Sequence, residues 1–174
     1  MTRLQDYDPV EADFLAHAPV RVVSQVRIRA AAELVFSVLE DGASWPVFVS
    51  AIRKVEWTSE RPWGVGTTRT VHMRGGTVAE EVFFAWDPGR RMAFRITRSN
   101  LRLFRALAED WAVAPNADGT STLTWTFAAA PRGPYRLLFR VLRRPMQASM
   151  KGIVHTLRRL AEARAIGRRS EGTS

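Results

Sequence analysis

The stretch that most constrains the fold of this 174-residue chain is a long amphipathic segment, Tyr135 to Ala165. At about 100° per residue, a helix here gathers its large apolar side chains on one face. That face carries Leu138, Phe139, Leu142, Met146, Met150, Ile153, Leu157 and Leu160. A separate face carries Arg136, Arg140, Arg143, Arg144, Lys151 and Arg158, with Val154 as an apolar exception on the basic side. We therefore expect one face to be buried and the other to meet water.

Pro145 interrupts this segment. Proline lacks a backbone N–H and clashes with the carbonyl four residues earlier. The segment is therefore predicted to be either one helix kinked at Pro145 or two helices, the second with Pro145 in its first turn. In both cases the preceding chain must supply the surface that the apolar face covers.

That surface is predicted to be an antiparallel sheet, because alternating segments are separated by turn residues. The predicted strands are 20–29, 53–59, 67–74, 77–86, 91–97, 103–113 and 121–129. Two short helical pieces, 30–39 and a turn running from Trp45-Pro46 to Ile52, follow the first strand. A twisted sheet joined by short turns curls, which leaves a concave side for the terminal helix. We expect an N-terminal extension (1–18), one domain (19–166) and a disordered basic tail (167–174).

The net charge of +9 lies entirely on residues 131–174, which hold 11 Lys and Arg against 2 Asp and Glu. One interpretation is an anionic partner: nucleic acid, the ribosome, lipid head groups or an acidic ligand. The alternative is a solvated helix face in a chain whose basic residues are 24 Arg and 2 Lys.

Several chemistries lack their usual sequence signatures. The chain has no cysteine, which excludes disulfides and thiolate metal sites. Its histidines, His17, His72 and His155, are far apart in sequence, so no metal site is expected. No glycine-rich phosphate loop occurs, so no nucleotide cofactor is expected. No apolar run nears about 20 residues and the N-terminus lacks a secretory signal's apolar core, so we expect a cytoplasmic protein without an integral membrane segment.

The ordered motifs resemble those of the START-like, or SRPBCC, helix-grip superfamily, and most closely its bacterial polyketide cyclase/dehydrase branch. They are AAAELVFSVLEDGASWPVF (Ala30 to Phe48), GVGTTRTVHM (Gly64 to Met73), EEVFFAWDPGRRMAFRIT (Glu80 to Thr97) and DGTSTLTWTFAAAP (Asp118 to Pro131). The resemblance implies an α+β fold in which a curved antiparallel sheet of about six to seven strands wraps around the long C-terminal helix. It also implies an apolar cavity between the two. The superfamily has no universal catalytic motif, so it assigns no catalytic residue here.

If this resemblance holds, six residues are candidates for the ligand-binding wall of that cavity. They are Trp111, Trp125, Leu142, Met146, Met150 and Ile153. Methionine is flexible and polarizable, and tryptophan combines a large apolar surface with one polar group. The alternative for each is ordinary core packing.

An ionisable side chain directed into the cavity would have a shifted pKa and could transfer protons or orient a ligand. The strand candidates are His72, Glu80, Glu81, Arg95, Glu109 and Asp110, of which His72 and Glu109 are the catalytic candidates. Strand parity places Glu109 in the cavity if Trp111 faces it. Parity places Glu80 there, rather than Glu81, if Phe84 and Trp86 face inward. The alternative is that these acids lie on the solvated face and pair with arginines such as Arg69, Arg95 or Arg105.

Three functions follow from these patterns. The first is binding or carriage of a polyketide-, lipid- or quinone-like hydrophobic molecule. The second is a cyclase/dehydrase-type enzyme that uses the same cavity without a metal or nucleotide cofactor. The third is an interaction module that presents the basic helix to an anionic partner.

Overall fold

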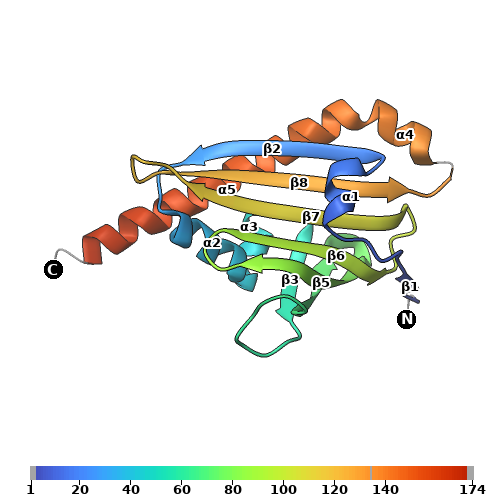
Figure 1. The fold of residues 1–174 in the computed structure, drawn as a ribbon, viewed down its shortest axis with the longest axis horizontal. Helices are drawn as coiled ribbons and strands as arrows, with labels where there is room; N and C mark the ends of the chain where they lie inside the picture. The colour runs from blue at the N-terminus through green and yellow to red at the C-terminus, as the bar shows by residue number, and fades with distance from the viewer. Residues whose placement is uncertain (1–2, 134, 172–174) are drawn as a thin grey trace.

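A computed structural model describes residues 3–133 and 135–171 and confirms the predicted α+β helix-grip architecture (Figure 1). The strands are β1 (Gln5–Asp6), β2 (Val20–Ile28), β3 (Ile52–Trp57), β4 (Thr68–Met73), β5 (Val78–Asp87), β6 (Arg91–Ser99), β7 (Phe104–Pro115) and β8 (Ser121–Pro131). The helices are α1 (Ala12–His17), α2 (Ala32–Glu40), α3 (Trp45–Phe48), α4 (Tyr135–Val141) and α5 (Arg143–Glu171), with short 3₁₀ turns at Gly42–Ser44 and Arg74–Gly76.

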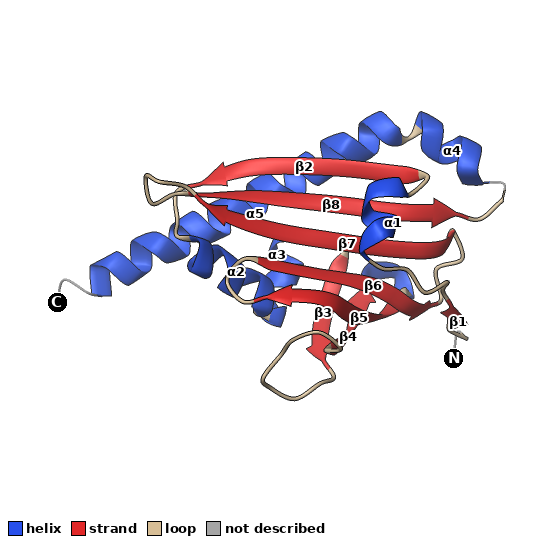
Figure 2. Ribbon diagram, viewed as in Figure 1, coloured by secondary structure: helices blue, strands red, loops and turns tan. Residues whose placement is uncertain are grey.

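All the strands belong to one antiparallel sheet, in the order β2-β8-β7-β6-β5-β4-β3, with β1 added beside β6 (Figure 2). From β3 to β8, each strand pairs with the next strand in the sequence. β2 pairs with β8 from Val20 opposite Ala129 to Ile28 opposite Ser121. Alternate β2 residues are buried from Val22 to Ile28, which confirms the period-two pattern in the sequence.

The terminal segment forms two helices rather than one kinked helix. Helix α4 ends at Val141 and α5 begins at Arg143, with Leu142 between them. Leu142 joins the two helices, since its N–H donates to the Leu138 carbonyl and its carbonyl accepts the Met146 N–H, each at 2.9 Å. Pro145 lies in the first turn of α5, where the missing backbone donor is tolerated, and it cannot bond the carbonyl of Val141. Of the two predicted arrangements, the second is therefore the one observed.

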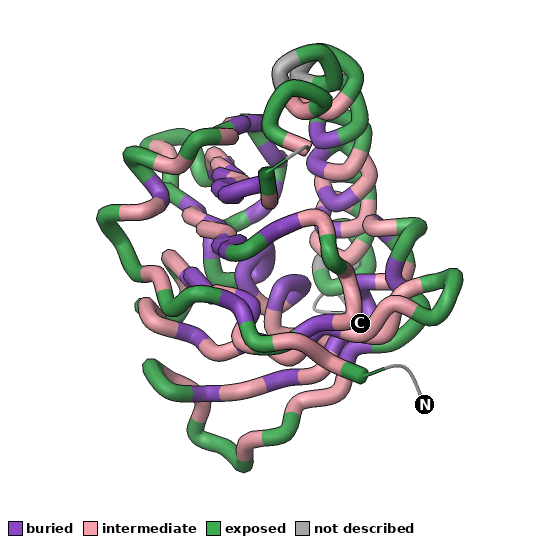
Figure 3. The backbone as a smooth tube through the Cα atoms, turned by 90° about the vertical axis from the view of Figure 1, so that its right-hand side faces the viewer, coloured by how far each residue is buried: buried purple, intermediate pink, exposed green. Residues whose placement is uncertain are grey.

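Helix α5 packs along the concave face of the sheet, and the residues that it buries differ in part from those predicted. Val154, assigned to the basic side by the helical projection, is fully buried together with Leu157 and Ala161. Leu138 and Leu142, assigned to the buried face, are 46% and 38% exposed. The projection assumed one straight helix, whereas the break at Leu142 separates the two helices. Figure 3 shows buried residues gathered in the interior, between the sheet and the helices.

Further contacts hold α5 in place beside the sheet. The Gln147 side-chain amide donates to the Val23 carbonyl of edge strand β2 at 2.7 Å. Nearer its C-terminus, Arg164 donates to Asp41, which caps the 3₁₀ turn, at 2.8 Å and to Ser44 within that turn at 2.7 Å. These bonds fix the distance between helix and sheet, and so the room available between them.

The N-terminal segment covers the opposite, convex face. Leu15 of α1 packs against Ala93, Ala108 and Ala128, small residues of three neighbouring strands on which a helix can lie closely. The division into an extension, a domain and a tail stays a prediction. Helix α5 continues to Glu171, and residues 172–174 of the expected tail lie outside the described residues. Within the described chain, no helix has the length and apolarity needed to cross a membrane.

Candidate functional site

A pocket of about 230 Å³ lies between the concave face of the sheet and the N-terminal half of α5. Its lining is mostly apolar and aromatic. The lining residues are Trp45, Val49, Ala51, Ile52, Arg69, Val71, Met73, Glu81, Phe94, Glu109, Trp111, Trp125, Phe127, Met146, Ser149, Met150 and Ile153. This volume is slightly below the roughly 300 Å³ at which small-molecule pockets usually begin. The enclosed part therefore suits a small ligand or one end of a larger one.

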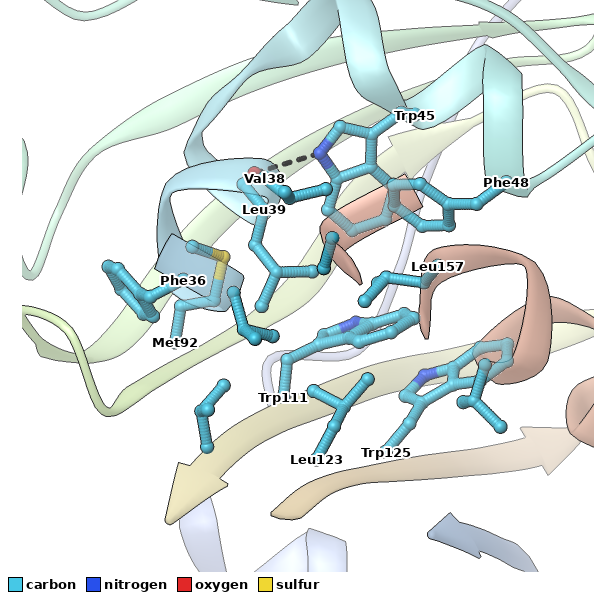
Figure 4. Packing of buried hydrophobic residues seen from close by; sticks show 14 of the residues in the cluster. Phe36, Val38, Leu39, Trp45, Phe48, Met92, Trp111, Leu123, Trp125 and Leu157 are labelled. Atoms are coloured by element: carbon cyan, nitrogen blue, oxygen red, sulfur yellow. Dashed lines mark hydrogen bonds between the residues drawn. The ribbon is translucent and has the colours of Figure 1, made fainter. Parts of the chain in front are cut away.

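Tryptophans form one wall of the pocket. Trp111 and Trp125 are directly paired residues of β7 and β8, and their rings stack with centroids 4.5 Å apart and planes 15° apart. Trp45 meets Trp111 edge-on at 5.4 Å, and its indole N–H donates to the Leu39 carbonyl at 2.9 Å (Figure 4). Because these rings brace one another, the wall is rigid and presents an aromatic surface to a ligand.

Glu109 is held at the edge of this tryptophan pair. It lies two residues before Trp111 in β7, so both side chains point to the same face of the sheet. Its Oε2 accepts the indole N–H groups of Trp111 and Trp125, each at 3.0 Å. Burial, together with the nearby Glu81 carboxylate, raises the pKa of Glu109 from 4.5 to about 7, against the opposing effects of the indole donors and Arg69. Near neutral pH this carboxyl group is therefore present in both protonation states.

A second charged group lies in the same pocket. Arg69 Nε donates to Glu81 Oε2 at 2.6 Å, and both side chains are buried. The guanidinium carbon lies 4.1 Å from the Trp45 ring centre and 4.4 Å from that of Phe94. Burial raises the pKa of Glu81, and Arg69 partly offsets this rise. Arg69 Nη1 is buried with no hydrogen-bond partner among the described residues, so a donor on the pocket lining is left unpaired.

A second hollow of about 370 Å³ adjoins the pocket between the segment after α3 and helix α5. The two hollows share Val49, Ala51, Ser149 and Ile153. Gly152 lines only the outer hollow, and a Cβ built on it would meet no atom within 4 Å. A ligand too long for the inner pocket has room to continue through this outer hollow.

The structure brings most of the sequence-predicted site residues together. Trp111, Trp125, Met146, Met150, Ile153 and Glu109 all line the pocket. Leu142 does not, because it lies exposed at the junction of α4 and α5. His72 of β4 also lies outside the pocket, where its Nε2 is 2.7 Å from Oε2 of Glu56 on the neighbouring strand β3.

Sequence reasoning missed Arg69 and chose the wrong member of the Glu80/Glu81 pair. In β5 the buried residues are Ala79, Glu81 and Phe83, so the parity based on Phe84 and Trp86 was wrong. Apolar residues occupy both faces there, and a register irregularity between Phe83 and Ala85 breaks the alternation. Trp86 therefore packs against the same core as Phe83, whereas Phe84 packs on the other face. A signal for Arg69 did exist, since it has the same parity in β4 as the fully buried Val71.

The site combines an apolar, aromatic lining with one carboxyl group whose pKa lies near neutrality and one buried guanidinium group. A resident metal has no evident place, because no group of three or more His, Cys, Asp or Glu in the described chain could hold one. A helix laid along a curved antiparallel sheet, with such a pocket between them, defines the START-like, helix-grip class.

The chain belongs to one family within that class. Residues 19–162 match the family described as polyketide cyclase / dehydrase and lipid transport. Uncharacterized proteins of Mycobacterium tuberculosis and Mycobacterium bovis are each 39% identical over 155 residues, which is 89% of this chain and 92% of theirs.

Solved structures share the fold at low sequence identity. An aromatase/cyclase from Streptomyces has a TM-score of 0.66 at 19% identity, covering 83% of this chain and 94% of its own. A START superfamily protein from Mycobacterium smegmatis has a TM-score of 0.62 at 13% identity, covering 84% of this chain and 97% of its own. At these identities the likeness establishes the fold alone.

Proposed function

We propose that the protein binds a hydrophobic small molecule, of polyketide-, lipid- or quinone-like chemistry, in the pocket between the sheet and α5. The observation that carries this proposal is the space left unfilled between the stacked tryptophans and the methionines of α5. Burying an apolar molecule there gains roughly 25 cal/mol per Å² of apolar surface removed from water. The family description, which includes lipid transport, supports the same proposal. We retain the cytoplasm as the proposed compartment on the sequence grounds above.

The test is titration with N-phenyl-1-naphthylamine, a neutral apolar dye that fluoresces when it leaves water. We expect saturable one-to-one binding by the wild type and its loss in Ile153→Trp, which fills the pocket. Val65→Trp is the matched control, because Val65 is 71% exposed on the loop between β3 and β4. Circular dichroism confirms that each variant is folded. Dye binding that survives in Ile153→Trp would refute binding in this pocket.

A second candidate function, dehydration of a β-hydroxy ketone, is favoured by the carboxyl group of Glu109 and the free donor of Arg69. In this reaction ionised Glu109 accepts a proton from the carbon next to the carbonyl, and Arg69 donates a hydrogen bond to the carbonyl oxygen. The carbon–oxygen bond to the hydroxyl then breaks as protonated Glu109 returns its proton to the leaving oxygen. A carbon–carbon double bond forms, water leaves, and Glu109 is again ionised.

The probe for this reaction is 4-hydroxy-4-phenyl-2-butanone, whose conjugated product absorbs in the ultraviolet. We expect the wild type to accelerate dehydration with a rate that rises through about pH 7, following the pKa of Glu109. Glu109→Gln should lose this acceleration while still binding the apolar dye. Equal dehydration rates with wild type, with the variant and in buffer alone would refute this second function and leave only ligand binding as the proposed function.

A further inference from the structure

An exposed apolar face lies on α4 and at its junction with α5. Leu137, Leu138, Val141 and Leu142 are 68%, 46%, 73% and 38% exposed. At about 100° per residue they follow one another around one side of the helix. Single exposed apolar residues are ordinary on a protein surface, whereas four adjacent ones mark an interaction site.

Packing fixes the direction of this face. Phe139, on another side of α4, packs against Phe104 at the start of β7, with ring centres 4.9 Å apart. Figure 1 shows α4 at one corner of the molecule, near the end of β8 and the start of β2. Leu137 borders a hollow between α4 and the start of β2, but all four apolar side chains of the face are exposed, so core packing does not account for it.

Basic groups adjoin the apolar face, and acidic groups are absent nearby in sequence. The side chains of Arg136 and Arg144 are exposed. The sequence contains no Asp or Glu from Gly119 to Ala161. A hollow of about 710 Å³ between α4 and the start of β2 is lined by Arg21 and Arg136. We use the name α4 patch for these two arginines and the four exposed apolar residues, which are Arg136, Arg144, Leu137, Leu138, Val141 and Leu142.

We propose that the α4 patch docks on an anionic phospholipid bilayer. Apolar side chains flanked by arginines are the composition of a helix that lies in a membrane interface, with the guanidinium groups among lipid phosphates. A nucleic acid would match the charge but would leave four large apolar side chains without apolar contacts. The proposal does not depend on the identity of the pocket ligand.

Docking there would also place the pocket beside the bilayer. Leu138, Leu142, Met146 and Met150 follow one another at four-residue spacing, so they form an apolar row along one side of the helices. Exposure falls along this row, from 46% at Leu138 to 3% at Met150, which lines the pocket. The row therefore leads from the docked surface to the pocket wall.

The experiment is co-sedimentation with vesicles of phosphatidylcholine alone or of equal amounts of phosphatidylcholine and phosphatidylglycerol. We expect binding to the anionic vesicles that weakens with salt. Arg136→Gln/Arg144→Gln should weaken it roughly fivefold per arginine. Leu137→Gln/Val141→Gln should weaken it at least roughly tenfold at any salt concentration. Val65→Gln and Arg90→Gln change exposed residues of the same types elsewhere and should bind like the wild type.

A site-specific label tests which residue enters the membrane, in addition to how tightly the protein binds. Because the chain has no cysteine, Val141→Cys can carry a single environment-sensitive fluorophore, with Val65→Cys as its control. Anionic vesicles should shift the emission to the blue at residue 141 and not at residue 65. Absence of binding, or equal binding by every variant, would overturn the proposal. So would a blue shift that grows with protein concentration without vesicles, since a second copy of the chain would then cover the patch.

Discussion

At the scale of single residues, Glu109 makes a distinct contribution to how the stability of the protein depends on pH. Because burial raises its pKa to about 7 from 4.5, the folded protein holds a proton that the unfolded chain has lost between these values. The stabilising effect is complete below about pH 4.5 and is lost as the pH rises through 7. At about 1.4 kcal/mol per pH unit, the loss is roughly 3 kcal/mol.

Glu109→Gln should remove this dependence, because glutamine does not titrate and its carbonyl oxygen still accepts an indole N–H. The measurement is urea unfolding of both proteins from pH 4 to pH 8. We predict that wild type loses roughly 3 kcal/mol relative to the variant over this range. A constant difference between the two proteins would contradict the placement of Glu109 in the pocket.

The ion pair between Arg69 and Glu81 permits a second prediction at this scale. Because both side chains are buried, removing one partner leaves an unpaired buried charge. Arg69→Met and Glu81→Gln should each cost about 3–5 kcal/mol, and the double variant much less than their sum. Urea unfolding of the four proteins in this cycle measures the coupling. Additive losses would show that the two groups do not interact.

At the scale of elements, the register of α5 on the sheet decides which of its residues stabilise the fold. Leu157→Ala removes a fully buried side chain and should cost about 2–5 kcal/mol, with Val154→Ala also destabilising. Leu142→Ala, at an exposed position in the same segment, should change stability by less than about 0.5 kcal/mol. Thermal or urea unfolding distinguishes this ranking from the one that the helical projection gives, in which Leu142 matters and Val154 does not.

The outer hollow beside α5 offers another test. Gly152→Phe introduces a ring into the hollow that adjoins the pocket and should slow both association and dissociation of the apolar dye. Gly152→Ala is the matched control, and it should stabilise the helix by roughly 0.5–1 kcal/mol without changing the dye kinetics. Unchanged kinetics in Gly152→Phe would mean that ligands enter by another route.

Local patterns in the sequence were sufficient to predict strands β2 to β8 and the terminal helices, whereas the short strand β1 was not predicted. Alternation identified the strands, and Pro145 identified the break in the terminal helix, because both depend on neighbouring residues. The burial of Val154 and the exposure of Leu142 depend on where the sheet ends beneath the helices, which no local pattern contains. Glu109 was placed through its spacing from Trp111, whereas Arg69 was read as a surface partner for acids. A buried arginine is rare unless it is paired, and its partner Glu81 is twelve residues away.

At the scale of the whole molecule, one sheet and one helix enclose a pocket that neither could form alone. The helix is fixed to the edge strand by Gln147 and to the 3₁₀ turn by Arg164. Between these points the side chains do not fill the space, although a large cluster of buried apolar residues surrounds it. This unfilled space is the basis of the proposed ligand binding.

The most direct test of that central claim is native mass spectrometry of freshly purified protein, followed by extraction and identification of anything bound. We predict one hydrophobic molecule per chain in the wild type and its absence in the pocket-filling variant Ile153→Trp. Val65→Trp, altered on the surface, should retain it. The same bound molecule in Ile153→Trp, or wild type that neither carries such a molecule nor binds the apolar dye, would contradict the account.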